Sequence, residues 1–358
     1  MVKCKIYASD EGFGHLVRQQ AVADALSRVI PDIHFDLQTR NQADAAAWLF
    51  PEARLIRRFN NILWPRDASG SPDLNATASF LYDYVERSRQ AVEEDTDAGT
   101  YDFLLSDFVY EAFAVAHKHR LPAFGICHFT WDWFFAKLYP SPVSSSVLSY
   151  MQALAGQAER LFFSEFSPPD LINHYANKAV VHPLIVRKRD GSVHLPGDRF
   201  RVLIMDSGAN VLTRSIENAL TQIHRLPDVQ FFMHEKFAIQ ADNVQLIPSN
   251  RPVIDYLQKM DLVITRGGFN TIAECIASRI PLLLIGEAMN PEIERNLFCV
   301  KQQDLGSFVS LERFSTNFAD TFKRFIDGEY PHIKSHMQSH DIRTDGADVV
   351  ANTVANML

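Results

Sequence analysis

The strongest constraint on this chain is an alternation of short apolar runs and helical stretches, which occurs twice along its length. In the first half, apolar runs rich in β-branched and aromatic residues stand at 3–9, 33–39, 103–108 and 123–129. Residues with helical spacing lie between them, as at 16–30 and 109–120. Strands that alternate with helices are typical of a parallel sheet covered by helices on both faces. We therefore expect an α/β fold of the doubly wound type.

The same alternation restarts after the stretch "HPLIVRKRDGSVHLPGDRF" at 182–200. In this second half, strands are expected at 201–207, 229–235, 243–248, 261–266 and 281–286. Helices are expected at 210–226, from about residue 270, and near the end of the chain at "GADVVANTVANML". The chain thus contains two α/β halves of similar length.

Domain boundaries follow from the point where the pattern restarts. The 358 residues of the chain exceed the roughly 100–200 of a single domain. We expect an N-terminal domain at 1–185, a linker at 186–199, a second domain at 200–335 and a C-terminal helix at 336–358 that could pack back on the first domain. Two facing Rossmann-like domains would bind ligands in the cleft between them, at the carboxyl ends of their strands.

Composition excludes several classes of protein. A net charge of −8 argues against nucleic-acid binding, which requires clustered positive charge. No apolar run approaches the ~20 residues of a membrane span, so contact with a membrane is expected to be peripheral at most. The four cysteines, Cys4, Cys127, Cys275 and Cys299, show neither a C-x-x-C pair nor metal-ligand spacing. We expect a cytoplasmic protein, and the sequence carries no signal for an oligomeric state.

The stretch "TRGGFNTIAE" at 265–274 places two glycines between a strand and a helix. Gly267 and Gly268 would allow a close approach to a ligand or a positive φ, with the helix beginning at Asn270 or Thr271. The free N–H groups at such a helix start bind phosphate without a metal ion. The alternative is a capping box, in which Thr271 and Glu274 only satisfy backbone groups of the helix end.

The loop "SDEGFGHLVR" at 9–18 is the N-terminal counterpart of this turn. A dinucleotide fingerprint would need a third small residue where Val17 stands, so that interpretation is weak. His15 stands at the start of the following helix, where a neutral imidazole could act as a general base. Alternatively, His15 caps the helix or steers a ligand.

The turn at 265–274 resembles the donor-binding box of plant UDP-sugar glycosyltransferases. It is also similar to the equivalent turn of the bacterial N-acetylglucosaminyltransferase that makes lipid II, and both enzymes belong to the inverting GT-B class. The resemblance implies that Asn270 and Thr271 contact the donor's phosphates and that Glu274 binds the ribose hydroxyls. Arg266 stands where the plant box has a histidine and could neutralise the leaving diphosphate, or it could form a salt bridge that points outward.

The same resemblance implies a catalytic pair in the first domain. In the plant enzymes the histidine of the first loop is the general base, and an aspartate after a later strand holds it. The matching residues here are His15 and Asp107, the latter in "FLLSDFVYEAF". The alternative for Asp107 is the N-cap of a helix over 108–118.

Over about residues 8–310, the chain most resembles the amino-terminal, glycosyltransferase-like half of plant L-arabinokinases and their stand-alone bacterial relatives. The resemblance is carried by "GFGHLVR", "SDFVYEAFAVAHKHRLPAFGICHFTWDW", "HPLIVRK" and "GGFNTIAE". The kinase half is absent and no Gly-x-x-x-x-Gly-Lys-Ser/Thr loop occurs, which disfavours kinase activity.

These patterns yield two sets of candidate site residues. Acceptor binding is expected from Gly14, His128, Trp131 and Asp132, although "CHFTWDWFFAKLY" would also suit a buried aromatic helix. By the resemblance, donor binding is expected from Ser207, Gly208, Arg266, Gly267, Gly268, Phe269, Asn270, Thr271, Glu274, Asn290 and Glu292. The alternative for Ser207 and Gly208 is an ordinary turn. Asn296 is a further candidate in the segment "GEAMNPEIERN", which lacks the family's usual sugar-binding pair.

The expected function is that of an inverting, metal-independent glycosyltransferase. It would move a sugar from a nucleotide-diphosphate donor, by analogy a UDP-sugar, to a hydroxyl of a small-molecule, lipid or glycan acceptor, with no further cofactor. One alternative is a nucleotide-sugar hydrolase or epimerase that uses the same cleft. Another is a non-catalytic nucleotide-sugar-binding module.

Overall fold

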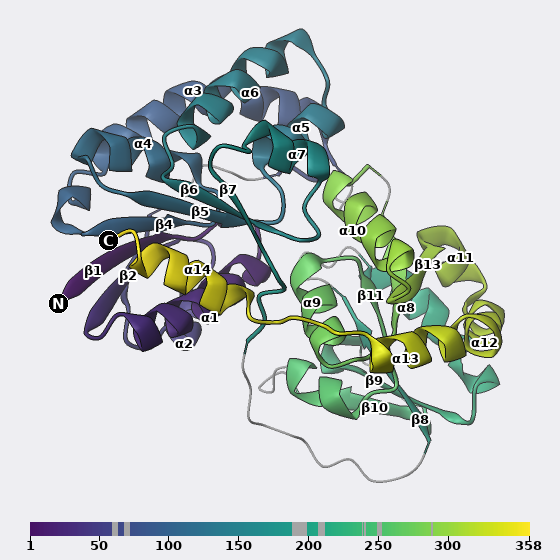
Figure 1. Ribbon diagram of the computed structural model, residues 1–358. Helices are drawn as coiled ribbons and strands as arrows, with labels where there is room; N and C mark the ends of the chain where they lie inside the picture. Colours follow the sequence, from purple (N-terminus) through teal and green to yellow (C-terminus); the bar gives the residue numbers. More distant parts are fainter. Residues whose placement is uncertain are drawn as a thin grey trace. The chain divides into compact units, whose positions relative to one another are not determined.

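The computed structural model describes most of the chain as two compact units (Figure 1). The described residues are 1–58, 64–67, 72–187, 199–206, 212–237, 239, 241–248, 253–287 and 289–358, except for the side chains at 142, 143, 253 and 254. Unit 1 comprises Met1–Arg187 and Arg343–Leu358, and unit 2 comprises Lys188–Ile342.

Unit 1 contains a sheet of seven strands in the order β3-β2-β1-β4-β5-β6-β7, and every neighbouring pair is parallel. The strands are β1 Val2–Tyr7, β2 Ile33–Gln38, β3 Arg54–Ile56, β4 Phe103–Ser106, β5 Ala123–Cys127, β6 Arg160–Ser164 and β7 Ala179–His182. The order reverses beside β1, which is the point where doubly wound sheets bind ligands at the carboxyl ends of their strands.

Helices cover both faces of this sheet (Figure 1). They are α1 Phe13–Val29, α2 Ala43–Leu49, α3 Leu74–Glu94, α4 Tyr110–His119, α5 Trp131–Leu138, α6 Pro142–Ala155, α7 Pro169–His174 and α14 Gly346–Ala355, with a 3-10 turn, η1, at Ala98–Thr100. One apolar core joins α1, α2 and α14 to one face of the sheet. A second core joins α3, α4, α5 and α6 to the other face.

Unit 2 contains six parallel strands in the order β10-β9-β8-β11-β12-β13. The strands are β8 Phe200–Met205, β9 Val229–His234, β10 Val244–Ile247, β11 Leu262–Arg266, β12 Leu282–Gly286 and β13 Gly306–Ser310. Numbered within the unit, this order is 3-2-1-4-5-6, the strand order of the Rossmann fold. The expected pair of Rossmann-like α/β domains is therefore confirmed.

The helices of unit 2 begin after the strands as the alternation predicts. They are α8 Thr213–Leu220, α9 Phe269–Ala277, α10 Pro291–Gln302, α11 Leu311–Thr316, α12 Phe318–Gly328 and α13 Tyr330–Ser339. Three 3-10 turns are also present: η2 Ile223–Arg225, η3 Glu235–Phe237 and η4 Val253–Lys259. The long helix expected at 210–226 is wrong, because α8 ends at Leu220 and a separate 3-10 turn follows.

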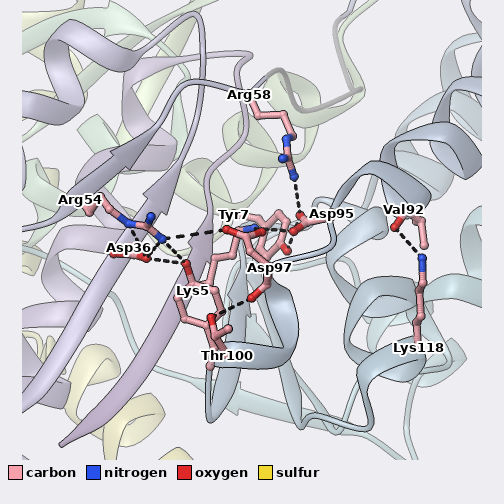
Figure 2. A network of polar contacts seen from close by, with 11 residues as sticks. Lys5, Tyr7, Asp36, Arg54, Arg58, Val92, Asp95, Asp97, Thr100 and Lys118 are labelled. Carbon is pink, nitrogen blue, oxygen red and sulfur yellow. Dashed lines mark hydrogen bonds and ion pairs between the residues drawn. The ribbon is translucent and has the colours of Figure 1, made fainter.

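A buried lysine ties the middle of the unit 1 sheet to the chain that follows α3 (Figure 2). The side chain of Lys5 on β1 is fully buried, and its Nζ lies 2.6 Å from Asp95 Oδ1 and 3.3 Å from Asp97 Oδ1. Tyr7 donates its hydroxyl proton to Asp95 Oδ2 at 2.8 Å, and Arg58 Nη1 lies 3.3 Å from the same oxygen. Because a buried charge is tolerated only with partners, this network fixes η1 against β1.

All four cysteines are buried and none forms a disulfide. Among the described residues, no helix is both long and apolar enough to cross a membrane. Likewise, no three His, Cys, Asp or Glu side chains of the described part of the chain are grouped so that they could hold a metal ion.

Candidate active site

The loop between β1 and α1 is held in place by a buried aspartate. Asp10 Oδ1 accepts a hydrogen bond from Thr39 Oγ1 at 2.7 Å and two from backbone N–H groups after β2, both at 2.9 Å. Gly12 is the N-cap of α1 in an extended conformation and makes no side-chain cap. His15 therefore stands in the first turn of α1, beyond the carboxyl end of β1, but it does not cap the helix.

Asp107 lies directly after β4, the strand next to β1. Its N–H donates to Tyr7 O at 2.9 Å, which continues the sheet ladder by one residue. The following residue, Phe108, has a φ of 48° and is therefore in the left-handed region, a costly conformation for an aromatic residue. The N-cap of α4 is Val109, without a side-chain cap, so the interpretation of Asp107 as a helix cap is wrong.

The structure brings His15 and Asp107 together. His15 Nδ1 lies 3.2 Å from Asp107 Oδ1, and the Asp107 side chain is 1% exposed while that of His15 is 18% exposed. Burial raises the pKa of the Asp107 carboxyl, but the nearby charges of Arg18 and His15 outweigh it, so the pKa lies below its usual value. Asp107 is therefore an ionised carboxylate at neutral pH.

The predicted acceptor residues separate into two groups. His128 is buried, and its Nδ1 lies 3.2 Å from Arg18 Nη1, so it belongs to the cluster around His15. Trp131 and Asp132 lie in the first turn of α5 and are 3% and 2% exposed. Trp131 packs on neighbouring aromatic rings of the core, and Asp132 accepts hydrogen bonds from the Tyr110 hydroxyl and the Gln152 amide. The acceptor role expected for these two residues has no support from their placement, because the core occupies them.

Gly268 is the N-cap of α9, and the helix begins at Phe269. Thr271 is therefore the third residue of the helix, and no side-chain cap is present. The capping-box interpretation of Thr271 and Glu274 is wrong for this reason. Of the two roles considered for the glycines, a positive φ is not adopted, since neither Gly267 nor Gly268 is in the left-handed region.

The start of α9 is nevertheless an open helix end. The first intrahelical bond runs from Ile272 N to Gly268 O at 3.1 Å, so the amides of Asn270 and Thr271 precede the hydrogen-bonded ladder. Both residues, and Glu274 one turn later, are only half-buried. A helix end of this kind attracts anions through its N–H groups and its dipole.

The predicted residue Arg266, at the end of β11, forms a salt bridge, which was one of its two interpretations. Its Nε lies 2.5 Å from Glu287 Oε2, and the two side chains are 11% and 7% exposed. Asn290 donates to the same carboxylate oxygen at 3.0 Å and caps α10 by accepting from Ile293 N. Asn290 therefore supports the loop after β12, and Arg266 points inward rather than outward.

Close packing explains one of the two glycines. A Cβ on Gly267 would stand 3.3 Å from Ile293 Cγ2 of α10, whereas one on Gly268 would meet no atom within 4 Å. Asn296 donates its amide to Gly267 O at 2.8 Å. Asn296 thus stabilises the turn through the carbonyl of Gly267, and no described side chain packs against the position of a Cβ on Gly268.

The remaining candidates are placed as follows. Phe269 is 2% exposed, so only its backbone can face a ligand. Glu292 stands half-buried in the first turn of α10, and Gly14 half-buried in the first turn of α1. Ser207 and Gly208 lie outside the described residues.

Sequence reasoning missed three residues of these clusters: Asp10, Arg18 and Glu287. Asp10 and Glu287 each follow a strand within three residues, which is where functional side chains of doubly wound sheets gather. Arg18 follows His15 by three residues, and this spacing places the two side chains on the same face of a helix.

Part of unit 2 is similar to a known protein family. Residues 205–306 match the model of the glycosyltransferase family 28 C-terminal domain. The matched part of unit 2 is similar to this glycosyltransferase domain. It contains β11, the turn at Gly267 and Gly268, α9, β12 and α10, so the open helix end lies within the matched region.

The chain is also similar in sequence to a known protein over part of its length. It is 23% identical over 228 residues to an uncharacterized glycosyltransferase of Methanosarcina acetivorans, a match that spans 58% of this chain and 59% of the relative. The chain therefore spans about three fifths of that relative's length.

Two solved structures are similar across nearly all of both chains. The glycotransferase of kitacinnamycin has a TM-score of 0.67 at 15% identity, and the comparison covers 99% of each chain. A Polygonum tinctorium UDP-glucosyltransferase capable of glucosylating indoxyl has a TM-score of 0.65 at 14% identity, with 99% of this chain and 98% of that chain covered. They share the GT-B fold of two Rossmann-like domains. With the domain match, these findings support a glycosyltransferase of the GT-B type.

Proposed function

We propose that the protein is an inverting glycosyltransferase that moves a sugar from a nucleoside-diphosphate donor to an acceptor hydroxyl. The observation that carries this proposal is the 3.2 Å contact between His15 Nδ1 and Asp107 Oδ1. A carboxylate beside one ring nitrogen orients the imidazole and favours a proton on that nitrogen, which leaves Nε2 as the base.

In the proposed reaction, Nε2 of His15 takes the proton of the acceptor hydroxyl as the oxygen attacks the anomeric carbon of the sugar. The bond between that carbon and the diphosphate oxygen breaks, and its electron pair leaves with the diphosphate. A single displacement of this kind inverts the anomeric configuration. The imidazolium that forms lies beside Asp107, which is ionised at neutral pH.

The open end of α9 is suited to stabilise the leaving diphosphate. Negative charge grows on the diphosphate in the transition state, and the Asn270 and Thr271 amides are fixed in the helix before the reaction starts. Loss of one such donor typically lowers the rate by about 10²–10³. Arg266 contributes less than its charge suggests, because Glu287 already neutralises it. Stabilisation by helix amides needs no metal ion, so we propose a metal-independent enzyme.

A UDP-sugar is the donor that we propose. Glu274 is half-buried one turn after Asn270, where an ionised carboxylate could accept hydrogen bonds from both ribose hydroxyls. Similarity to a UDP-glucosyltransferase supports the choice of uridine.

Ligand binding is the first test of this proposal. Unfolding temperatures of the full chain would be measured with increasing UDP, GDP and TDP and with their sugar derivatives, because stabilisation grows with ligand concentration over Kd. We expect stabilisation by UDP and UDP-sugars. No response to any nucleoside diphosphate would contradict the proposal.

Product analysis is the second test. A labelled donor would be incubated with panels of hydroxyl-bearing acceptors and also without any acceptor. We expect label in an acceptor with inverted configuration. Release of free sugar alone would indicate a hydrolase, an isomerised donor would indicate an epimerase, and binding without turnover would indicate a non-catalytic module.

A further inference from the structure

Arg18 lies at the centre of the polar contacts around His15. It stands three residues after His15 on α1, and its side chain is 2% exposed. Its Nη2 contacts Asp107 Oδ1 and lies 3.3 Å from His15 Nδ1, while its Nη1 lies 3.2 Å from His128 Nδ1. One buried guanidinium therefore touches two imidazoles and the carboxylate that faces the candidate base.

The chemistry of the guanidinium determines where the proton of His128 resides. Arginine is charged at any relevant pH, and its nitrogens only donate hydrogen bonds. The nitrogen that faces Arg18 Nη1 must therefore accept, so Nδ1 of His128 carries a lone pair. The proton of a neutral His128 is then on Nε2, which makes that atom a donor.

His15 faces two neighbours with opposite demands on the same nitrogen. Asp107 Oδ1 only accepts hydrogen bonds and therefore favours a proton on His15 Nδ1, whereas Arg18 Nη2 only donates and favours a lone pair there. The two tautomers differ in function. Only a proton on Nδ1 leaves Nε2 of His15 able to take a proton from an acceptor hydroxyl.

The geometry decides how strongly Arg18 can compete. Asp107 Oδ1 and His15 Nδ1 are 3.2 Å apart, and Arg18 Nη2 is closer to the oxygen than to the nitrogen. Seen from Nη2 the two atoms subtend an acute angle, whereas the two N–H bonds of a planar guanidinium nitrogen diverge by about 120°. Arg18 cannot aim one N–H straight at each atom, and its charge-assisted bond to the carboxylate is the stronger of the two.

We propose that Arg18 is a positioning residue that sets the tautomers of both histidines. It holds the proton of His128 on Nε2, and it limits the fraction of His15 molecules that carry the proton on Nδ1. Without Arg18, Asp107 would be the one described residue in contact with Nδ1 of His15, and that fraction would rise. The link to catalysis rests on the proposed function, in which His15 is the base, but the tautomers themselves can be measured without it.

The test is nitrogen-15 NMR of the full chain labelled at histidine. The chain has 13 histidines, so His15→Asn and His128→Asn variants would assign the two sets of ring signals. Spectra would be recorded over about pH 6 to pH 9 to identify the neutral forms. In the wild type we expect pyridine-type Nδ1 and pyrrole-type Nε2 shifts for His128, and averaged shifts for His15.

Two variants remove the contacts of Arg18 to different extents. Arg18→Met should move the shift of His15 Nδ1 toward the pyrrole type. It should also remove the preference of His128 for a proton on Nε2, so that the two ring nitrogens of His128 give averaged shifts. Arg18→Lys keeps the charge beside Asp107, but a lysine has no planar guanidinium that could contact all three partners. It should therefore also remove the tautomer preference of His128. If Arg18→Met fails to fold, Arg18→Lys alone tests the proposal through the tautomer of His128. The matched control is Arg28→Met, since Arg28 is exposed on the same helix and pairs with Asp348.

The outcomes separate this inference from the proposed function. Unchanged tautomers of both histidines in folded Arg18 variants, or a wild-type His128 with its proton on Nδ1, would overturn the role of Arg18 whatever the activity. Shifted tautomers in a protein that transfers no sugar would retain the role of Arg18 and contradict the glycosyltransferase. If both hold, Arg18→Lys should change kcat more than KM.

Discussion

Arg266 at the end of β11 and Glu287 after β12 form an ion pair, with 2.5 Å between Nε and Oε2, while both side chains are almost buried. The pair stands directly beside the turn that opens α9. It therefore fixes the approach to the proposed diphosphate site and leaves little net charge there.

The first prediction concerns the stability of this ion pair. Glu287→Ala should lower the free energy of unfolding by about 3 kcal/mol, because it leaves the Arg266 charge without this partner in a nearly dry environment. Urea denaturation would measure the loss. The matched control is Asp320→Ala, which removes the exposed partner of Arg225 and should cost less than about 1 kcal/mol. Equal losses in the two variants would show that the buried pair has no special weight.

The second prediction concerns the candidate base. His15→Ala should lower turnover by about 10²–10⁴, because it removes the proposed general base. Affinity for the nucleotide should stay within a few fold, since donor binding is assigned to unit 2. Steady-state kinetics and calorimetry would measure the two effects. The control is His34→Ala, which changes an exposed histidine of β2. Turnover as fast as that of the wild type would remove His15 from the mechanism.

The third prediction separates ribose binding from helix stability at Glu274. Because Gly268 is the N-cap of α9, Glu274 has no capping role to lose. Glu274→Ala should weaken UDP binding by about 10-fold or more, the equivalent of one hydrogen bond to a charged group. The loss of UDP affinity should be larger than any accompanying fall in the unfolding temperature without ligand would explain. Glu312→Ala, at an exposed position of α11, is the control. Wild-type affinity for UDP in Glu274→Ala would contradict ribose binding by this residue.

The fourth prediction concerns the pH dependence of stability. Burial lowers the pKa of His182 to about 4, and a hydrogen bond from its Nδ1 to Pro183 O at 2.6 Å only partly offsets this shift. The unfolded chain binds the proton at about pH 6.5, so between pH 6.5 and pH 4 the unfolded state holds more protons than the folded state. Stability is therefore complete above that window and falls as the pH decreases through it.

The size of this effect can be measured by comparison with a variant. Between about pH 7.5 and pH 5, His182 should cost the wild type about 2 kcal/mol of unfolding free energy. His182→Asn keeps an N–H donor for Pro183 O but does not titrate, so its urea midpoint should fall less over the same interval. Carboxylates with lowered pKa values, among them Asp36, Asp97 and Asp107, lose their contribution only at more acidic pH. Parallel pH profiles for wild type and variant would contradict the role of His182.

Sequence reasoning correctly located the polar cluster at the carboxyl ends of β1 and β4. His15 and Asp107 follow β1 and β4, and the expected contact between them is present. It could not predict that Trp131 and Asp132 are buried, since aromatic and acidic residues look the same in a core as in a binding site. The capping box that was the alternative for Thr271 and Glu274 is wrong, because the position of a helix start within two residues is not encoded by a local motif alone.

The sequence by itself determined the repeated α/β architecture and the glycine turn before α9. These features depend on side-chain periodicity and local backbone preferences, which act over a few neighbouring residues. Only the tertiary structure decided that Arg18 meets Asp107 and His128, which are 89 and 110 positions away in the chain. Such contacts depend on which strand ends become neighbours and on which side chains lose water, and both follow from the packing of the whole unit.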